Sequence, residues 1–377
     1  MNSILRQIVA VLAAFCLFGL PNGITSYGNF GDRPIRGVNL GGWLVLEKWI
    51  RPSVFSGLPD SVDDEYKFCQ TLGKTEAAKR LRSHWDSWVT EQDIVNYKNA
   101  GINHVRIPIG YWALDIKQGE PWVSGSWDYV VKAVGWCKKY GLKVMLDLHG
   151  APGSQNGNDH SGQSGSINFY SNDENLQRAT NVVKQMATFA NGTNWRDTVT
   201  IIQLLNEPIL WGNEYNYRLT RLKQYYRMAY DAVRAVNNIA VVAVHDAFID
   251  PSNWYYLRDD SHYYWMMLDV HLYQVFGDEY KNLSCQEHEK VACRYRDRLR
   301  QANQKLWTVV GEWSLATPIS CSNKANIARQ QIGVYEMATG WFFWAHKNEQ
   351  GWQDWSFQDS YKNGRIRPNN VNVAVCP

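Results

Sequence analysis

The sequence has no long run of like charges and almost no net charge. Its 39 Lys and Arg residues nearly balance its 36 Asp and Glu residues, which leaves a formal charge of +3 on 377 residues. A nucleic-acid-binding surface and a polybasic membrane anchor are therefore not expected. Linkers rich in Pro or Ser, low-complexity stretches and internal repeats are also missing. We therefore predict one folded domain over residues 27–377, which suits a chain that is 45% apolar and 20% charged.

Long hydrophobic runs are missing too, apart from one apolar stretch near the N-terminus. This stretch, Ile8–Leu20, follows Arg6 and is shorter than the roughly 20 residues that cross a bilayer. It matches the apolar core of a secretory signal peptide, which we place at residues 1–26. A signal anchor is the alternative, and it would need a longer run. We therefore expect a secreted protein, located outside the cell or in the cell wall, with no membrane partner.

Cysteine is scarce, and Cys16 would leave with the signal peptide. The six cysteines that remain allow fifteen full pairings, so the disulfide pattern stays open. Cys137 lies in a helical pattern and is a candidate for a free buried thiol. Sequons at Asn191 and Asn282 fit N-glycosylation in a eukaryotic secretory route.

Aromatic residues, in contrast, are abundant. The chain has 18 Trp, 21 Tyr and 12 Phe residues, which amount to 14% of the sequence. Most of these rings are expected in the core. Flat rings also stack on the C–H faces of sugars, so the composition is compatible with a carbohydrate-binding protein.

Short apolar runs alternate with amphipathic helical patterns along the chain. Near-continuous apolar runs of this length indicate strands that are buried on both faces. The runs are Ile35–Trp43, Ile102–Ile109, Lys143–His149, Val199–Glu207, Ile239–Asp246, Trp265–Tyr273, Leu306–Ser314 and Gly340–His346.

The helical patterns between the runs carry recognisable end signals. Thr90 and Asp93 form a capping-box pattern, and Gly101 closes that helix before the second run. Ser126–Tyr140 forms another helical pattern, which Gly141 ends. Eight strands alternating with helices in one domain predict a single (β/α)8 TIM barrel of the α/β class. A doubly wound open sheet is the alternative, but no Gly-rich phosphate loop follows the first strand.

Polar or aromatic residues end each of the eight runs. Barrel enzymes build their active sites where the carboxyl ends of the strands meet, so these residues are candidates for one site. They are Asn39, Arg106, His149, Asn206, Glu207, His245, Asp246, His271, Tyr273, Glu312, Trp313 and Trp344.

Two of these residues, Glu207 and Glu312, would face each other across the barrel mouth. Glycoside hydrolysis needs such a pair, with one protonated acid and one ionised carboxylate. We expect Arg106 to keep Glu312 ionised, and a less compensated setting to raise the pKa of Glu207. Either residue alone could equally form a structural ion pair, but the two together predict catalysis.

Metal binding is the alternative role for the His and Asp residues of this set. His149, His245, Asp246, Asp269 and His271 could in principle bind zinc. Metallohydrolase barrels usually carry His-x-His on the first strand, however, and the first run has no His. The alternation of Asp269 and His271 also suits hydrogen-bonded groups inside a barrel. We therefore predict no metal and no cofactor.

Seven motifs together resemble glycoside hydrolase family 5, and more narrowly its fungal exo-β-1,3-glucanase branch. They are RGVNLGGWLVLE, HVRIPIGYW, DLHGAPGSQNG, LLNEP, HDAF, HLYQVF and GEWS, and the similarity runs from Arg36 to Trp355. The combination of DLHGAPGSQNG with HLYQVF is highly specific, whereas NEP alone is moderately so. The resemblance implies a (β/α)8 barrel that cleaves glycosides with retention and without a metal.

The resemblance also implies roles for individual residues. Glu207 matches the acid/base of the family, and Glu312 matches the nucleophile, which Tyr273 would orient. Asn206 would bond the 2-hydroxyl of the sugar, and Glu47 would hold outer hydroxyls of the terminal glucose. The other positions that match the family's substrate-binding pattern are Arg106, His149, His271, Phe276 and Trp344.

Two departures from the family's pattern concern the walls of the pocket. In the fungal members two rings clamp the acceptor sugar. Phe276 matches one of these rings, but Asn158 stands at the position of the other. Trp344 matches a different residue, the one that forms the floor under the terminal glucose. The segment between the seventh and eighth strands, Ser314–Thr339, is also much shorter than in the fungal members. We therefore expect a more open acceptor side and less strict exo action.

The leading hypothesis is a secreted retaining hydrolase that releases glucose from the non-reducing ends of β-1,3-glucans through a covalent glucosyl-enzyme. Its partner would be a β-1,3-glucan polysaccharide or oligosaccharide and no nucleic acid, and we expect a monomer. β-1,6-Glucanase, other β-glucosidase and transglycosylase activities are alternatives within the family. A glucan-binding protein without catalysis is the alternative from another class, but both Glu residues are present. A structural cell-wall protein would carry Ser/Thr-rich stalks, which are missing.

Overall fold

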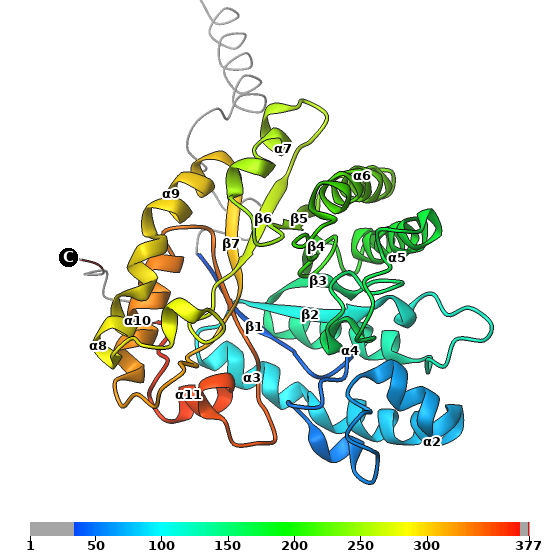
Figure 1. Ribbon diagram of the computed structural model, residues 1–377, viewed down its shortest axis with the longest axis horizontal. Helices are drawn as coiled ribbons and strands as arrows, with labels where there is room; N and C mark the ends of the chain where they lie inside the picture. The colour runs from blue at the N-terminus through cyan, green and yellow to red at the C-terminus, as the bar shows by residue number, and fades with distance from the viewer. Residues whose placement is uncertain (1–33, 370–375, 377) are drawn as a thin grey trace, which may run out of the picture.

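The computed structural model describes residues 34–369 and residue 376. The chain forms a closed barrel of eight parallel strands in sequence order, in which β1 pairs with β8 (Figure 1). The predicted (β/α)8 barrel is confirmed, whereas the predicted signal peptide lies outside the described residues. The strands are β1 (Ile35–Asn39), β2 (His104–Gly110), β3 (Lys143–Gly150), β4 (Val199–Gln203), β5 (Val241–His245), β6 (Met266–His271), β7 (Trp307–Trp313) and β8 (Gly340–Phe343).

All eight predicted strands are present, but several end earlier than their apolar runs. β4 stops at Gln203, although its run continues to Glu207. The N–H of Leu204 still donates to the carbonyl of Ala243 at 2.9 Å, and the chain then leaves the barrel wall. Glu207 has a φ of 42°, which lies in the left-handed region. This backbone conformation differs from the extended one of a β-strand. This residue therefore belongs to the loop above the strand.

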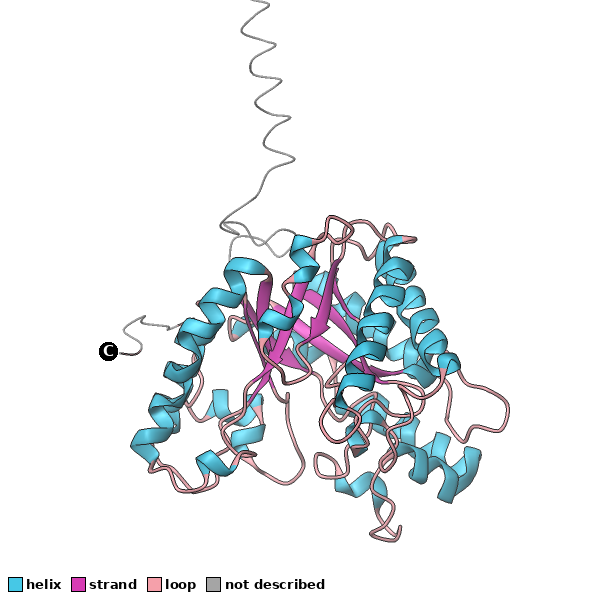
Figure 2. Ribbon diagram, turned by 45° about the horizontal axis from the view of Figure 1, so that its top comes forward, coloured by secondary structure: helices cyan, strands magenta, loops and turns pink. Residues whose placement is uncertain are grey.

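Helices surround the strands, as Figure 2 shows. The α-helices are α2 (Glu65–Trp88), α3 (Glu91–Asn99), α4 (Ser126–Tyr140), α5 (Asp173–Asn191), α6 (Tyr215–Arg234), α7 (Tyr256–Asp259), α8 (Cys285–Val291), α9 (Arg296–Lys305), α10 (Lys324–Tyr335) and α11 (Phe357–Lys362). Short 3-10 helices lie in the connections: η2 (Pro52–Phe55), η3 (Tyr111–Ala113), η4 (Asp159–Ser161), η5 (Pro251–Trp254), η6 (Asp278–Tyr280), η7 (Ala292–Tyr295) and η8 (Gln353–Trp355).

The helix ends follow the predicted signals. The side chain of Thr90 accepts from the N–H of Asp93, and the Asp93 carboxylate accepts in return from the N–H of Thr90, which completes the capping box of α3. α4 spans the predicted residues, and Gly141 ends it with φ of 70°. That backbone angle is one that glycine adopts without strain.

The interior of the barrel is apolar toward the strand starts and polar toward the strand ends. The apolar part is a buried cluster that includes Met145, Ile201 and Phe342. Gly37 lies so close to Phe342 that a Cβ atom would come within 2.1 Å of the ring. The polar part includes Arg106, which is completely buried. The packed apolar layer therefore forms the base that carries the polar groups at the carboxyl ends.

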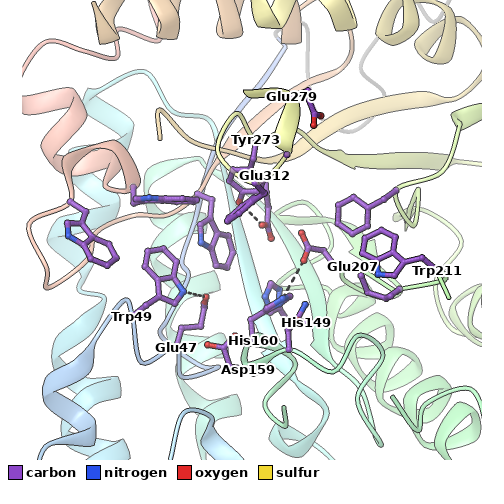
Figure 3. A pocket seen from close by; sticks show the side chains of 18 residues that line it. Glu47, Trp49, His149, Asp159, His160, Glu207, Trp211, Tyr273, Glu279 and Glu312 are labelled. Atoms are coloured by element: carbon purple, nitrogen blue, oxygen red, sulfur yellow. Dashed lines mark hydrogen bonds and ion pairs between the residues drawn. The ribbon is translucent and has the colours of Figure 1, made fainter. Parts of the chain in front are cut away.

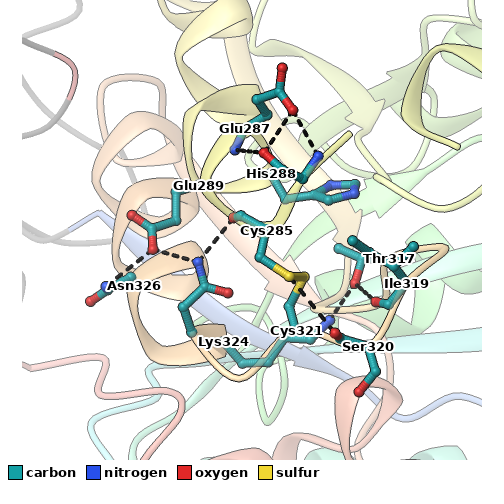
Figure 4. The surroundings of a disulfide bond; sticks show 12 residues. Cys285, Glu287, His288, Glu289, Thr317, Ile319, Ser320, Cys321, Lys324 and Asn326 are labelled. Carbon is teal, nitrogen blue, oxygen red and sulfur yellow. Dashed lines mark hydrogen bonds between the residues drawn. A yellow bond between two sulfur atoms is a disulfide. The ribbon is translucent and has the colours of Figure 1, made fainter. Parts of the chain in front are cut away.

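Two disulfides brace the side of the barrel formed by α8, α9 and α10. Cys285 at the start of α8 pairs with Cys321 in the loop before α10 (Figure 4), and Cys293 in η7 pairs with Cys376. Cys137 is buried and free, as predicted. Among the described helices, none combines the length and the apolar content needed to cross a membrane.

Candidate active site

A cavity of about 930 Å³ opens at the carboxyl ends of the strands. Its walls come from β3 and β7 and from the loops that follow β1, β3, β4, β5, β6 and β8 (Figure 3). The predicted residues Arg106, Asn206 and His271 are buried behind its wall. The other predicted site residues line it: Glu47, His149, Glu207, Tyr273, Phe276, Glu312 and Trp344.

Glu312 lies near the end of β7, and both of its oxygens are held. The Nη1 atom of Arg106 donates to Oε1 at 2.9 Å, and the hydroxyl of Tyr273 donates to Oε2 at 2.8 Å. The carboxylate is only 4% exposed, so few water molecules solvate it. The sequence analysis expected this contact between Arg106 and Glu312. The two donors also fix the direction in which the carboxylate faces the cavity.

Arg106 is the centre of the buried polar layer. Its Nε donates to Gln203 at 2.9 Å, and its Nη2 donates to the side-chain oxygen of Asn206 at 2.7 Å. Its Nη1 also donates to Asn39 at 2.9 Å, and Asp147 lies 3.0 Å from Nη2. A buried cation needs such partners, because desolvation is otherwise unfavourable. Arg106 therefore positions carboxylates and amides, and it does not face the cavity itself.

His149 connects this polar layer to the cavity floor. Its Nδ1–H donates to Asp147 at 2.7 Å, and its Nε2 lies 3.4 Å from the side-chain nitrogen of Asn206. Burial lowers the pKa of His149 well below its usual value, which keeps the imidazole neutral. Its ring is nearly parallel to that of Trp344, with centroids 5.4 Å apart and an interplanar angle of 6°. The predicted floor residue is thus held flat against a neutral ring.

Glu207 has a histidine as its partner, whereas Glu312 has Arg106. The Nδ1–H of His271 donates to Oε1 of Glu207 at 2.6 Å. The other ring nitrogen of His271 lies 3.3 Å from Asp269. The Nε2 atom of His160 in η4 lies 3.5 Å from Oε2 of Glu207. Both carboxylate oxygens therefore face imidazole rings.

These contacts overturn the predicted direction of the Glu207 shift. Burial alone would raise the pKa of Glu207, but the hydrogen bond and charge of His271 outweigh it and hold the pKa below its usual range. Burial would likewise lower the pKa of His271, yet the nearby Glu312 and Asp269 carboxylates and the bond to Glu207 raise it well above normal. The prediction of an uncompensated Glu207 was wrong because sequence spacing did not show that His271 folds against it.

The same imidazole sets the distance between the two carboxylates. The Nδ1 atom of His271 lies 2.6 Å from Oε1 of Glu207 and 3.4 Å from Oε2 of Glu312. These two oxygens are therefore at most about 6 Å apart. Retaining glycosidases separate their carboxyl groups by about 5–5.5 Å, and inverting ones by about 6.5–9.5 Å. The bound on this one pair of oxygens lies close to the retaining separation.

One end of the cavity is rich in carboxylates and tryptophan. Glu47 accepts from the N–H of Gly42 at 3.2 Å and from the indole of Trp49 at 3.0 Å. Burial, then the charges of Asp159 and Glu312, raise the pKa of Glu47 well above its usual value. Figure 3 shows Glu47, Trp49 and Asp159 together on one side of the two central carboxylates. We call this the Glu47 end.

The other end carries Trp211 and Phe248, which sequence reasoning did not select. Their rings are 5.5 Å apart and tilted by 40°, and Ile209 lines the cavity with them. Asn158 also lines the cavity. Phe276 lies at the mouth, where it is 72% exposed, and its ring contacts Tyr273.

Other lining residues missed by the sequence analysis are Trp49, Asp159, His160, Glu279, Trp352 and Trp355. Asp159 and His160 directly follow the SQNG motif and Asn158, so the motif itself was a usable signal. Trp49 and Trp352 lie in loops and Trp355 ends the short η8, so no periodic pattern shows which way these rings point.

One group of described residues has metal-ligand spacing. Glu207, His245 and His271 offer atoms that all lie within 4.8 Å of one another. Both ring nitrogens of His271 already face carboxylates, and Nδ1 of His245 accepts from the N–H of Ala247 at 2.9 Å. Among the ring nitrogens of these two described histidines, only Nε2 of His245 has no hydrogen-bond partner.

Comparisons with known proteins agree with this geometry. The family described as Cellulase (glycosyl hydrolase family 5) matches residues 69–357. The chain is 38% identical to glucan 1,3-beta-glucosidase of Blumeria graminis, over 90% of this chain and 88% of that protein. It is 34% identical to glucan 1,3-beta-glucosidase 1 of Schizosaccharomyces pombe, over 85% and 84%. The solved structure of rutinosidase from Aspergillus niger has the same fold, with a TM-score of 0.80. The match has 21% identity and covers 90% of this chain and 99% of that chain.

Proposed function

The chain belongs to glycosyl hydrolase family 5, and from this membership we propose that it is a retaining hydrolase that releases glucose from the non-reducing ends of β-1,3-glucans. The names of its relatives, glucan 1,3-beta-glucosidases, support the substrate class. The observation that carries the mechanism is the separation of Glu207 and Glu312, whose nearest described oxygens are at most about 6 Å apart.

In the first step, Glu312 attacks the anomeric carbon of the terminal glucose. A bond forms between a carboxylate oxygen and that carbon, and the bond from the carbon to the glycosidic oxygen breaks. Glu207 gives its proton to the departing oxygen, so the leaving sugar departs as a neutral alcohol. The hydrogen bonds from Arg106 and Tyr273 hold Glu312 in line for this attack.

The proton on Glu207 comes from its pairing with His271. The pair holds one shared proton, which rests on Nδ1 and lies across a 2.6 Å contact from Oε1. As Glu312 forms the new bond it loses its negative charge, and the imidazolium loses one of the charges that stabilise it. The proton then moves to Glu207, while the other ring nitrogen stays directed at Asp269.

In the second step, water replaces the leaving sugar. Glu207, now ionised, takes a proton from this water as its oxygen bonds to the anomeric carbon, and this proton returns to Nδ1 of His271. The ester bond to Glu312 breaks, and the carboxylate returns to Arg106 and Tyr273. Two displacements at one carbon give glucose with its original configuration.

The Glu47 end is the donor-sugar subsite in this proposal. Its carboxylates, Glu47 and Asp159, are acceptors for sugar hydroxyls, and Trp344 provides a flat face against which the ring can stack. Asn206 would bond the 2-hydroxyl through its side-chain nitrogen, since its oxygen accepts from Arg106.

We also propose that the enzyme acts outside the cell or in the cell wall. Its relatives are fungal glucan hydrolases by name, and its two disulfides suit an oxidising compartment.

A trapping experiment tests the catalytic assignment. A 2-deoxy-2-fluoro β-glucoside with a good leaving group should form a stable ester on Glu312, which peptide mass spectrometry would locate. The Glu312→Gln variant should form no adduct and lose glucan hydrolysis. An adduct on another residue, or near-normal turnover by the variant, would reject the assignment.

A further inference from the structure

Two large aromatic rings stand exposed on the cavity wall beside Glu207. Trp211 is 57% exposed and Phe248 is 39% exposed, and the two rings contact each other. Figure 3 shows Trp211 on the side of Glu207 that faces away from Glu47 and Trp49. Exposed apolar surface that lines a cavity commonly marks a binding site. We call this pair the aromatic platform.

The backbone under Phe248 is held in an unfavourable shape that keeps its ring in place. Ala247 and Phe248 have φ angles of 54° and 57°, which residues with a side chain rarely adopt. The N–H of Ala247 donates to His245 at 2.9 Å, and the N–H of Phe248 donates to Asp246 at 2.8 Å. Strained turns of this kind collect at functional sites. The hydrogen bonds of the loop after β5 therefore fix the position of the Phe248 ring in the platform.

The platform lies on the side from which a leaving group departs. The Phe248 ring is 6.5 Å from the ring of His271, whose Nδ1–H bonds to Glu207. Trp211 follows Glu207 in the same loop. In the proposed function Glu207 protonates the departing oxygen, so whatever is attached to that oxygen extends over these rings.

The surface of this end offers rings on which a flat aromatic leaving group can stack. Ile209, Trp211 and Phe248 line the cavity here with apolar side chains. A flat aromatic ring that extends from the departing oxygen can stack on these two rings. We propose that the aromatic platform is a subsite for flat aromatic aglycones, and that the enzyme cleaves aryl β-glucosides with extended ring systems. The proposal rests on the proposed function for its catalytic part.

Two pairs of synthetic glucosides test the proposal. 2-Naphthyl and phenyl β-glucosides have leaving groups of similar acidity and differ by one fused ring. For the wild type we expect kcat/KM to be about fivefold higher for the naphthyl compound, as one added aromatic contact allows. Trp211→Ala should bring this ratio close to one. The corresponding thioglucosides, which are not cleaved, should show the same preference in calorimetric binding.

Trp352→Ala is the matched control, because Trp352 is also exposed but stacks on Trp49 at the other end. Its naphthyl-to-phenyl ratio should equal that of the wild type. Equal binding of the two thioglucosides by the wild type would overturn the platform and leave the proposed function intact. A thioglucoside preference without hydrolysis of any glucoside would keep the platform and reject the proposed function. A Trp211→Ala loss that is equally large on laminaribiose would make the platform a sugar subsite and overturn the aglycone assignment.

Discussion

The Nδ1 atom of His271 lies 2.6 Å from Oε1 of Glu207. The two groups are buried together and share one proton. The pKa of each group therefore differs from the pKa that it would have without the other. Burial opposes ionisation of both, but their contact and the neighbouring carboxylates raise the pKa of His271 and lower that of Glu207. The pair therefore keeps its proton to a higher pH than an isolated carboxylic acid would.

His271→Asn should move the basic limb of the kcat/KM profile to lower pH. Without the imidazole, Glu207 must hold the proton by itself. Burial raises the pKa of this carboxylic acid, but that pKa still lies below the raised pKa of His271, so the proton is lost at a lower pH. The measurement is kcat/KM against pH for glucan and for an aryl glucoside. Tyr273→Phe, which leaves the pair intact, is the control. A basic limb that stays in place while turnover falls would show that His271 has only a structural role.

Glu207→Ala should impair substrates with poor leaving groups most. General acid catalysis contributes about 10²–10⁴-fold, so glucan hydrolysis should fall by that order, while an activated aryl glucoside should still form the glucosyl-enzyme. Added azide should then capture the intermediate as a β-glucosyl azide. Equal losses on both substrates without an azide product would contradict the acid/base assignment.

Asn158→Phe should favour transfer of glucose to another sugar. Asn158 lines the cavity where the fungal pattern has a ring, and an added ring pair contributes roughly 1 kcal/mol to stacking. Acceptor sugars should then compete several-fold better with water. The measurement is the ratio of glucose to longer oligomers at high laminaritriose concentration. An unchanged ratio would place residue 158 outside the acceptor site, and Asn158→Leu separates ring stacking from added bulk.

Replacing Cys285 and Cys321 together by Ser should lower the free energy of unfolding by about 2–4 kcal/mol, because the open chain gains conformational freedom when unfolded. The bond joins α8 to the loop before α10 across 36 residues, and Figure 4 shows how closely these segments meet. Denaturant unfolding measures the effect. A reductant should destabilise the wild type more than the double variant. Equal stability of the two proteins would mean that the packing of α10 holds this region without the bond.

The barrel and the position of its site could be predicted because both depend on repeating patterns. Strands buried on both faces leave continuous apolar runs, and parallel strands end at one rim. Glu207 and Glu312 could therefore be placed near each other, because they lie at the ends of the fourth and seventh runs. Arg106 could be paired with Glu312 for the same reason.

What could not be predicted depends on distances that no pattern encodes. His271 belongs to β6 and Glu207 to the loop after β4, so their contact appears only when the barrel closes. Trp211 and Phe248 lie in loops, where side-chain direction follows from individual φ angles. The pairing of the cysteines could not be predicted, because six cysteines allow many pairings. Only the packing of α8 beside α10 shows which cysteines lie close together.

The pairing of β1 with β8 bears on how the protein is made. Ile35 lies opposite Gly340 and Val38 opposite Phe343, so the first strand finds its second neighbour only in the last strand. During synthesis the N-terminal half leaves the ribosome long before that neighbour exists, and one edge of β1 stays without a partner strand. Contacts so distant in sequence slow folding. A truncation that removes β8 would therefore leave an open sheet whose edge can pair with other chains. During synthesis, this edge is covered only after almost the whole chain has been made.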